Sequence, residues 1–495
     1  MFSTYLDSRH ELCRELVRRL GGRYIYASVL GKHVTGRRFM VSTATTTITE
    51  TNEKQCGFVV KVNDGQHYSE YSFTDITADN IDELEQRIVN ELTLSGHIAS
   101  QHVNAEIMAD EPLVRDFVRP MNGQPLTVQE TVARLSELRD QVHAASAKVV
   151  QSIMMLENYE TSSVFVSKNR DLTQNYSWNS MYGIAVAREG NTIQEAMASA
   201  AANSTEETLR IMSGKTEGLA KLAEELLSAE LIEPGVYDII TAPSITGLIA
   251  HEAFGHGVEM DMFVKKRARA RHYVNKAVAS PLVNMHDGAA VRVPAELSKQ
   301  NIEEVSAGHM NSDGSADFMN DPCVGYFFDD DGVLAHDTQI IKDGILVSGI
   351  SDAVSAAELG TEPTGNGRRQ DPSRKAYTRM TNTYFAPGKD KLEDMIGSIE
   401  HGYMLFETSN GMEDPKNWNI QCVACYGREI RNGKFTGKLV APVVMSGYVP
   451  DLLMSISAVS DEWQIIGAGH CGKGYKEWVP VSDGGPYLKA RCKLG

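Results

Sequence analysis

Two histidines that flank a glutamate are the best candidates for catalytic chemistry in this chain. The segment H-E-A-F-G-H places Glu252 beside His251, and His256 follows five positions after the first histidine. Imidazole nitrogens bind zinc, and a neighbouring carboxylate can act as a general base, as in the H-E-x-x-H motif of zinc peptidases. Here three residues, not two, separate Glu252 from His256. Two interpretations stay open: a metal site, or polar residues near a helix end, where histidine suits the dipole.

The extra residue matters because of helix geometry. Pro243 and Ser244 favour a helix start, which places the first histidine and the glutamate late in that helix. In a regular α-helix, residues five apart point about 140° away from each other, against about 40° for residues four apart. Both imidazoles can therefore reach one metal ion only if the helix is distorted or ends. Gly255 precedes the second histidine and makes such a change easier, because glycine tolerates backbone that other residues cannot adopt.

The composition restricts the class of protein. A chain of 495 residues is too long for one ordinary core, and 42% hydrophobic and 23% charged residues are typical of a globular protein of two or three domains. Acidic residues outnumber Lys and Arg by 65 to 48, and the net charge of −17 argues against direct nucleic acid binding. No apolar run approaches the length of a membrane span, so we expect no membrane partner either.

The cysteines indicate the compartment. Their number is odd and they are scattered along the chain, unlike a disulfide framework: Cys13, Cys56, Cys323, Cys422, Cys425, Cys471 and Cys492. The N-terminal segment carries charges where a signal peptide would have an apolar core. We therefore expect a cytoplasmic protein. Cys422 and Cys425 form a lone C-x-x-C, for which buried strand cysteines are a simpler explanation than a metal or redox site.

The first half of the chain mixes helical and strand patterns. We expect helices over residues 5–20, 80–97, from Thr127 onward, and over the Ala- and Glu-rich region 192–230. We expect strands over residues 23–75, 163–167 and 182–190. Thr127 and Glu130 can form a capping box. Asn63-Asp64-Gly65 is typical of a hairpin turn.

A boundary is expected at Pro234-Gly235, where the helical region ends. The second half is richer in strands and turns, with hairpin signals at Asp343-Gly344 and Asn432-Gly433. We predict an α+β protein of two domains. The first is a mixed α/β domain over residues 1–233, and the second is a strand-rich catalytic domain over residues 234–495.

Several motifs of the second half resemble the TldD/PmbA family of metallopeptidases, long labelled modulators of DNA gyrase. They are, in order, HEAFGHGVEMD (251–261), FDDDG (328–332), TGNGRRQ (364–370), RMTNTY (379–384), CGKG (471–474) and VPVSDGGP (479–486). The first half is similar in layout, more weakly. The inactive branch of the family lacks H-E-x-x-x-H, so this chain resembles the active, TldD-like branch.

The resemblance implies one Zn²⁺ per chain, bound by His251, His256 and Cys471. The residues alone give little reason to choose Cys471 over Cys492. Glu252 would then be the general base that activates a zinc-bound water for attack on a peptide carbonyl. Unfolded or flexible peptides are the expected substrates. The expected partner is a second subunit, in a homodimer or in a heterodimer with an inactive family member.

Other residues of these motifs could bind substrate or stabilise the oxyanion: Asn366, Arg368, Arg369, Arg379 and Asn382. A structural role is the alternative, since the arginines can pair with the many acids of the chain. Glu259 and Asp261 could orient a histidine or simply be surface charges. His470 adjoins Cys471 and could compete as a ligand.

Three other functions remain open. A non-catalytic or regulatory subunit of a TldD/PmbA-type complex would keep zinc for structure, with four protein ligands. A zinc amidase would use the same chemistry on non-peptide substrates. A regulator of DNA topology would have to act indirectly, given the negative charge, for example through degradation of a peptide. Metal content, hydrolysis and DNA binding at low salt distinguish these possibilities.

Overall fold

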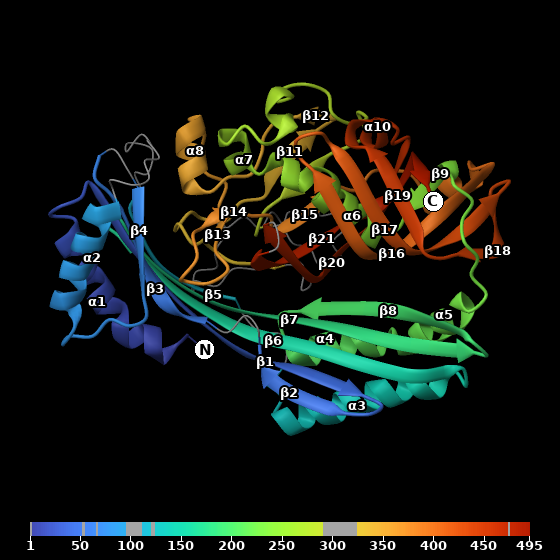
Figure 1. The fold of residues 1–495 in the computed structure, drawn as a ribbon, viewed down its shortest axis with the longest axis horizontal. Helices are drawn as coiled ribbons and strands as arrows, with labels where there is room; N and C mark the ends of the chain where they lie inside the picture. The colour runs from blue at the N-terminus through green and yellow to red at the C-terminus, as the bar shows by residue number, and fades with distance from the viewer. Residues whose placement is uncertain are drawn as a thin grey trace.

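The computed structural model contains two large β-sheets, one from each half of the chain, with helices packed on both (Figure 1). It describes residues 2–51, 55–65, 68–95, 111–119, 124–290, 324–473 and 476–495. Strands and helices from both halves confirm the predicted α+β class and the two-domain arrangement. The boundary at residues 233 and 234 falls between the two sheets, and we propose it as the domain boundary. Within the described residues, no helix is long and apolar enough to cross a membrane.

The first sheet is long and mostly antiparallel. Its strands are β1 (Tyr26–Ser42), β2 (Thr46–Glu50), β3 (Gln55–Asn63), β4 (Tyr68–Phe73), β5 (Leu113–Val118), β6 (Val149–Ser167), β7 (Arg170–Glu189) and β8 (Thr192–Ala202). They are ordered β4-β3-β1-β6-β7-β5, with β2 paired to β1 and β8 paired to β7. The antiparallel pairing of β3 with β4, which begins at Asn63 and Tyr68, confirms the hairpin predicted at Asn63-Asp64-Gly65.

Five helices cover the two ends of this sheet (Figure 1). They are α1 (Thr4–Leu20), α2 (Ile81–Ser95), α3 (Val128–Ala145), α4 (Thr205–Ser213) and α5 (Thr216–Leu226). The helices α1 and α2 share one apolar core with the sheet, and α3, α4 and α5 share another. At the start of α3, Thr127 and Glu130 form the predicted capping box.

The prediction of continuous helix over residues 192–230 is wrong in its first part. Residues 192–202 form β8, which pairs with β7 along its whole length through a tight turn in which Gly190 has φ of 59°. Alanine favours helices, but here its small side chains let α4 and α5 pack closely on the strand, and this tertiary packing outweighs propensity. The Gly190-Asn191 pair in the sequence was the available signal for a turn.

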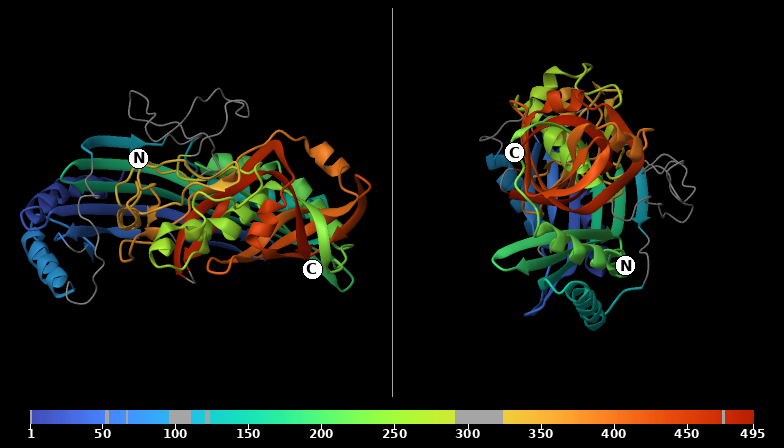
Figure 2. Two further views of the ribbon diagram at one scale, coloured as in Figure 1. Left: turned by 90° about the horizontal axis from the view of Figure 1, so that it is seen from above. Right: turned by 90° about the vertical axis from the view of Figure 1, so that its right-hand side faces the viewer.

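The second sheet curls into a closed ring. Its strands are β9 (Gly235–Thr241), β10 (Met285–Asp287), β11 (Thr338–Lys342), β12 (Ile345–Leu346), β15 (Asn382–Phe385), β16 (His401–Asp414), β17 (Asn419–Arg431), β18 (Lys434–Val440), β19 (Val443–Tyr448), β20 (Ala458–Lys473) and β21 (Lys476–Leu494). Five of them close on themselves in the order β9-β16-β17-β19-β21, because β21 also pairs with β9. The ring is visible end-on in Figure 2.

Short elements surround or fill the ring. They are α6 (Pro243–Leu248), η2 (Ile249–Gly255), η3 (His256–Val258), α7 (Met260–Val264), η4 (Arg269–His272), α8 (Ala353–Leu359), β13 (Gly367–Arg368), β14 (Tyr377–Thr378), α9 (Leu392–Gly397) and α10 (Val449–Met454). All residues of α6 are buried, as expected for a helix enclosed by a sheet. Two further hairpin predictions are confirmed, at Asp343-Gly344 and Asn432-Gly433, where all four residues have positive φ.

A buried network of ion pairs joins the first sheet to the second half. Lys61 of β3 pairs with Asp331 of the FDDDG motif, and its Nζ lies 3.2 Å from Glu70 Oε1. Arg369 Nη2 lies 3.1 Å from the same Glu70 oxygen. Burial disfavours the charged carboxylate, but Arg369 and Lys61 outweigh it and lower the pKa of Glu70 to about 2. The network therefore fixes the two halves against each other.

Substituting Lys61→Met is expected to lower the free energy of unfolding by about 3–5 kcal/mol, because it leaves the buried carboxylate of Asp331 without its cation. Urea denaturation measures this change. Lys221→Met removes an exposed pair with Glu217 and is expected to leave the free energy of unfolding almost unchanged. Equal losses in the two variants would contradict a structural role for the buried network.

Candidate metal centre

The helix that carries the two histidines changes its hydrogen-bonding pattern inside the ring. α6 has Pro243 in its first turn, continues as the π-helical segment η2, and ends in the 3₁₀ turn η3. The backbone N–H of His256 donates to the carbonyl of His251, a bond that spans five residues. Such a bond defines a π-helical turn, which holds one residue more than an α-helical turn. The expected distortion is confirmed, and it places both imidazoles on the same side.

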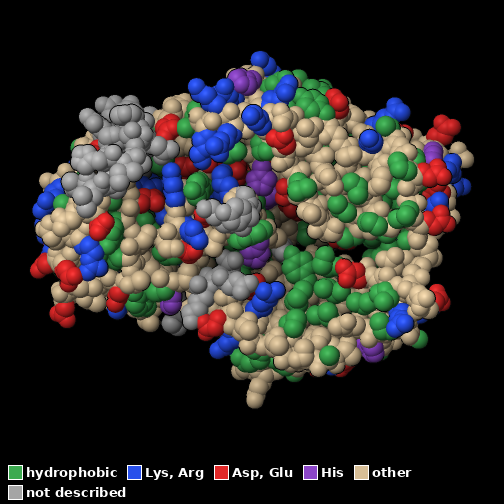
Figure 3. Space-filling model, viewed as in Figure 1, with side chains coloured by type: hydrophobic (Ala, Val, Ile, Leu, Met, Phe, Trp, Pro, Cys, Tyr) green, Lys and Arg blue, Asp and Glu red, His purple; other side chains and the backbone are tan. Residues whose placement is uncertain are grey.

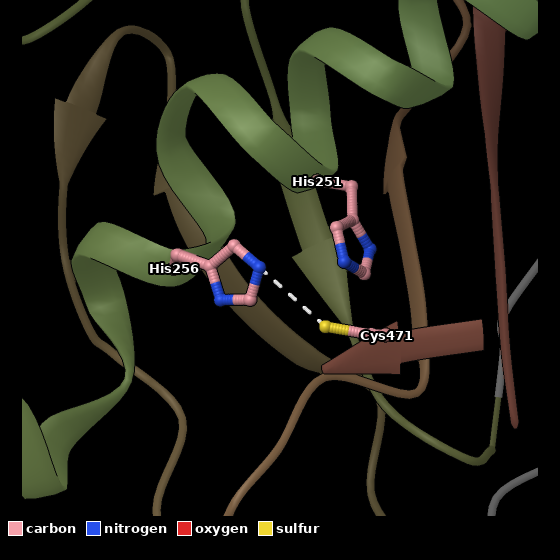
Figure 4. Close-up of side chains that lie close together, drawn as sticks. All are labelled: His251, His256 and Cys471. Carbon is pink, nitrogen blue, oxygen red and sulfur yellow. Dashed lines mark hydrogen bonds between the residues drawn. The ribbon is translucent and has the colours of Figure 1, made fainter. Parts of the chain in front are cut away.

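Three side chains converge at this point (Figure 4). The donor atoms of His251, His256 and Cys471 all lie within 4.8 Å of one another. Cys471 comes from β20, and its Sγ lies 3.4 Å from His256 Nε2. The two imidazole rings are perpendicular, with centroids 5.2 Å apart. His251 and Cys471 are each only 4% exposed, so the site is largely shielded from solvent.

The three groups influence one another's charge. Burial opposes protonation of His251, but the negative charge of Cys471 outweighs it and raises the pKa of His251 to about 9. The pKa of His256 is raised for the same reasons. Burial alone would raise the pKa of the Cys471 thiol, yet the two histidines lower it well below its usual value. The site therefore stabilises a thiolate, the form of cysteine that binds metals.

Glu252 lies beside the three donor residues but is not one of them. Its Oε2 is 3.9 Å from His256 Nε2. Its side chain packs against Gly411 of β16, where a Cβ would lie 2.6 Å from Glu252 Cγ. Position 411 therefore admits no side chain unless Glu252 moves. A glycine inside a strand often marks such a close approach, and this was the only sequence signal for Gly411.

A second layer of charges supports His256. Glu259 Oε2 lies 3.6 Å from His256 Nδ1, on the opposite side of the ring from Cys471. Lys473 donates to Glu259 at 2.8 Å and to Asp261 at 3.0 Å. Both carboxylates are buried, so they are not the surface charges that the sequence also allowed. A carboxylate on the far nitrogen of a histidine fixes its orientation.

The structure also places the five residues suggested for substrate contact: Asn366, Arg368, Arg369, Arg379 and Asn382. All five are buried. Asn366 donates to Asp287 Oδ1 at 2.7 Å, and Asn382 donates to two backbone carbonyls, each at 2.8 Å. Arg368 donates to a backbone carbonyl at 2.8 Å, and Arg369 pairs with Glu70. None of the five is among the converging donors, and substrate contact by them stays a prediction.

Arg379 connects the two elements that carry the site. Its Nη2 donates to the backbone carbonyl of Cys471 at 2.7 Å, and Nη1 donates to the carbonyl of Glu477. Its Nε lies 3.7 Å from Glu259 Oε1. The guanidinium thus joins the hairpin of Cys471 to the carboxylate that faces His256. This arrangement indicates that Arg379 positions the site.

Two buried aspartates near His251 were not singled out from the sequence. Burial raises the pKa of Asp287 to about 7, although it accepts hydrogen bonds from Asn366 and Thr383. Burial likewise raises the pKa of Asp483 to about 7. Asp483 contacts the helix at Gly247, where a Cβ would lie 2.5 Å from its Oδ1. Its place within the VPVSDGGP motif was the sequence feature that could have identified Asp483 as a residue near the site.

The remaining cysteines and His470 lie outside the donor group. Cys422 is buried in the core of the ring, and Cys425 packs on the core under α3 to α5. Both are free, as are all cysteines among the described residues. The ring of His470 lies 6.0 Å from that of Trp178 in the first sheet. Because successive strand residues face opposite sides, His470 points away from the metal donors.

Comparisons with known proteins place the chain among metalloproteases. The family model described as PmbA/TldA metallopeptidase C-terminal domain matches residues 234–301 and 311–492. A metalloprotease of Synechocystis is 26% identical over 391 residues, which cover 77% of each chain. A zinc metalloprotease TldD homologue of Saccharolobus solfataricus is 26% identical over 379 residues, or 74% of this chain and 75% of the relative.

Solved structures share the fold at low identity. TldE from Thermococcus kodakarensis superposes with a TM-score of 0.68 at 16% identity, covering 97% of this chain and 99% of its own. A Thermotoga maritima protein, described as a candidate modulator of a DNA gyrase, gives a TM-score of 0.73 at 15% identity, covering 99% of this chain and 100% of its own.

Proposed function

Since the chain belongs to the PmbA/TldD family of metallopeptidases, we propose that it is a zinc-dependent hydrolase of peptide bonds with its metal held by His251, His256 and Cys471. The observation that carries the proposal is the convergence of these three donor atoms in a buried site. The helix that brings two of them together departs from α-helical geometry at that point. π-helical turns of this kind occur frequently at functional sites.

The donor set fits one zinc ion. Two imidazole nitrogens and a thiolate are ligands that zinc favours, and three protein ligands leave one position open, as in catalytic sites. The two histidines, which lower the pKa of Cys471, support an anionic sulfur at this position. A bound zinc ion would polarise a peptide carbonyl and make a water molecule more acidic. The Saccharolobus relative is described as a zinc metalloprotease, which supports the choice of ion.

Glu252 is the proposed general base. Its carboxylate lies beside the donor atoms, and Gly411 allows it to approach that closely. In this role Glu252 removes a proton from the attacking water and returns it to the leaving amine. Glu259 holds the orientation of His256 through Nδ1, and Arg379 holds the backbone of Cys471. These two residues position the site and need not contact substrate.

Flexible peptides are the proposed substrates. A cavity of about 440 Å³ lies between the first sheet and the β20–β21 hairpin, and is lined by Tyr182, Gln370, His470 and Trp478 among others, although not by the proposed metal donors or Glu252. Such a space can take the side chains of an extended peptide but not a folded domain. We also propose a second subunit, identical or an inactive relative, because one structural neighbour is TldE. The free cysteines support a reducing, cytoplasmic setting.

Removal of the metal tests the proposed function. The purified protein is expected to contain about one zinc per chain and to cleave an unstructured peptide. A chelator is expected to abolish cleavage, and added Zn²⁺ is expected to restore it. Elemental analysis and peptide mass spectrometry on the same samples measure both effects. Zinc that stays bound without cleavage would indicate a structural or regulatory subunit, and cleavage after complete zinc removal would disprove the metal mechanism.

A further inference from the structure

A strongly basic segment interrupts this acidic chain directly after the proposed metal site. Six Lys and Arg residues lie between Asp261 and Asp287, with no Asp or Glu among them, whereas the whole chain has a net charge of −17. Five of these cations form what we call the basic surface: Lys266, Arg267, Arg269, Arg271 and Lys276. The sixth, Lys265, pairs with Asp261 at 2.9 Å and is not included.

The fold holds these cations in place. Ala268 and Ala270 are buried in the core, and the arginines that alternate with them are turned outward. The backbone N–H of Arg269 donates to the carbonyl of Pro415, and its guanidinium lies 5.9 Å from the centre of the Trp418 ring. Cation–π contacts of this kind help to fix an arginine. The backbone of this segment is therefore anchored in the core, and the Arg269 guanidinium is held beside the Trp418 ring.

The cations of the basic surface have no acidic partner within the described part of the chain. Arg271 contacts only a neighbouring histidine ring, and Lys276 donates to the carbonyl of His272. Lys266, Arg267, Arg269 and Lys276 are exposed, and Arg271 is half-buried. Figure 3 shows basic side chains gathered at the top of the molecule, over α7 and the loop that follows it. Clustered cations that have no acidic partner among the described residues create a positive potential that attracts an anionic partner.

The basic surface is connected to the proposed metal site by a short path. It follows α7, which begins only four residues after His256. Asp261 of α7 holds Lys265 on one side and Lys473, two residues beyond Cys471, on the other. A ligand on the basic surface thus lies next to the elements that carry the metal donors. In Figure 3 the same face is hollowed below these basic side chains, between the upper and lower parts of the molecule.

We propose that the basic surface binds an acidic segment of the peptide substrate and gives the enzyme a preference for peptides rich in Asp and Glu. This inference rests on the proposed peptidase function. A short acidic segment can be bound by the five cations of the basic surface alone. A long polyanion such as DNA would also meet the negative remainder of the surface, which would repel it. Acidic peptide is therefore the partner that the charge distribution favours.

The test compares an unstructured peptide that carries several glutamates with its counterpart in which glutamines replace them. The zinc-loaded protein is expected to favour the acidic peptide about tenfold in kcat/KM at low ionic strength, because several weak exposed ion pairs add together. The preference should vanish near 1 M salt, where screening acts over about 3 Å. In the triple variant Lys266→Gln, Arg267→Gln, Lys276→Gln the ratio should fall toward one.

A matched control carries the same change of charge elsewhere. Arg134→Gln, Lys168→Gln and Lys434→Gln alter exposed cations on α3, on the β6–β7 turn and on β18, and should keep the preference. Binding of the labelled peptides, measured by fluorescence anisotropy in the Glu252→Gln background, tests the surface even if neither peptide is cleaved. Equal binding of the two peptides would overturn the proposal. Tighter binding of a single-stranded DNA, lost in the triple variant, would overturn it in favour of a nucleic acid site.

Discussion

Glu252→Gln is expected to lower the rate of peptide hydrolysis by about 10²- to 10⁴-fold while zinc remains bound, because a general base typically contributes that much. The glutamine keeps the shape of the side chain, so its packing against Gly411 should be unchanged. It cannot take a proton from water. The two histidines and the cysteine that form the donor group are untouched. Elemental analysis and kcat, measured on the same preparation, give the two results.

The control for this variant is Glu393→Gln, which makes the same change at an exposed position of α9. It should leave kcat and zinc content unchanged. If Glu252→Gln hydrolyses the peptide at the wild-type rate, another group must be the base. If it loses zinc as well as activity, the carboxylate must be a ligand or must hold one in place.

Cys471→Ser is expected to weaken zinc binding by more than the roughly 10- to 100-fold that loss of an outer partner costs, because it removes a ligand outright. A serine hydroxyl does not supply the thiolate that zinc favours. The fold should persist, since the ring closes through pairings of β9, β16, β17, β19 and β21 that do not involve this side chain. Zinc titration and circular dichroism measure the two effects.

Cys492→Ser is the matched control. Cys492 is also a buried, free cysteine of the second sheet, but it lies outside the group of converging donors. Its substitution should leave zinc affinity unchanged. Full zinc retention in Cys471→Ser would refute the ligand assignment, and equal loss in both variants would attribute the effect to disturbed packing.

Local patterns predicted local structure well. The spacing of the histidines and the position of Gly255 indicated a distorted helix, and the structure contains a π-helical turn there. The turn dipeptides indicated the hairpins because their backbone requirements are set within a few residues. The prediction over residues 192–202 failed because alanine content describes helix propensity alone. The strand there is determined by β7 and by the helices above it.

The candidate site was only partly predictable, for the same physical reason. Cys471 lies 215 positions from His256, and no local pattern carries that contact. The assignment of Cys471 as a ligand therefore depended on the resemblance of the motifs to the family. Gly411 and Asp483 approach the helix from β16 and β21, and their roles depend on strand register and ring closure. The arginines and asparagines of the motifs are buried and hydrogen-bonded to other parts of the chain, and their contact with substrate stays a prediction.

The closed ring also sets the order in which the second sheet can fold during synthesis on the ribosome. β9 pairs with both β16 and β21, and Gly235 faces Leu494. The pairing of β9 with β21 can therefore form only after more than half of the chain has been added, which takes roughly 10 to 50 s at ordinary rates of synthesis. Until then the ring that encloses the helix with both histidines is open, and for most of that time the cysteine of β20 has not been synthesised. The proposed metal site can therefore form only late, and metal binding there would follow translation of the second half of the chain.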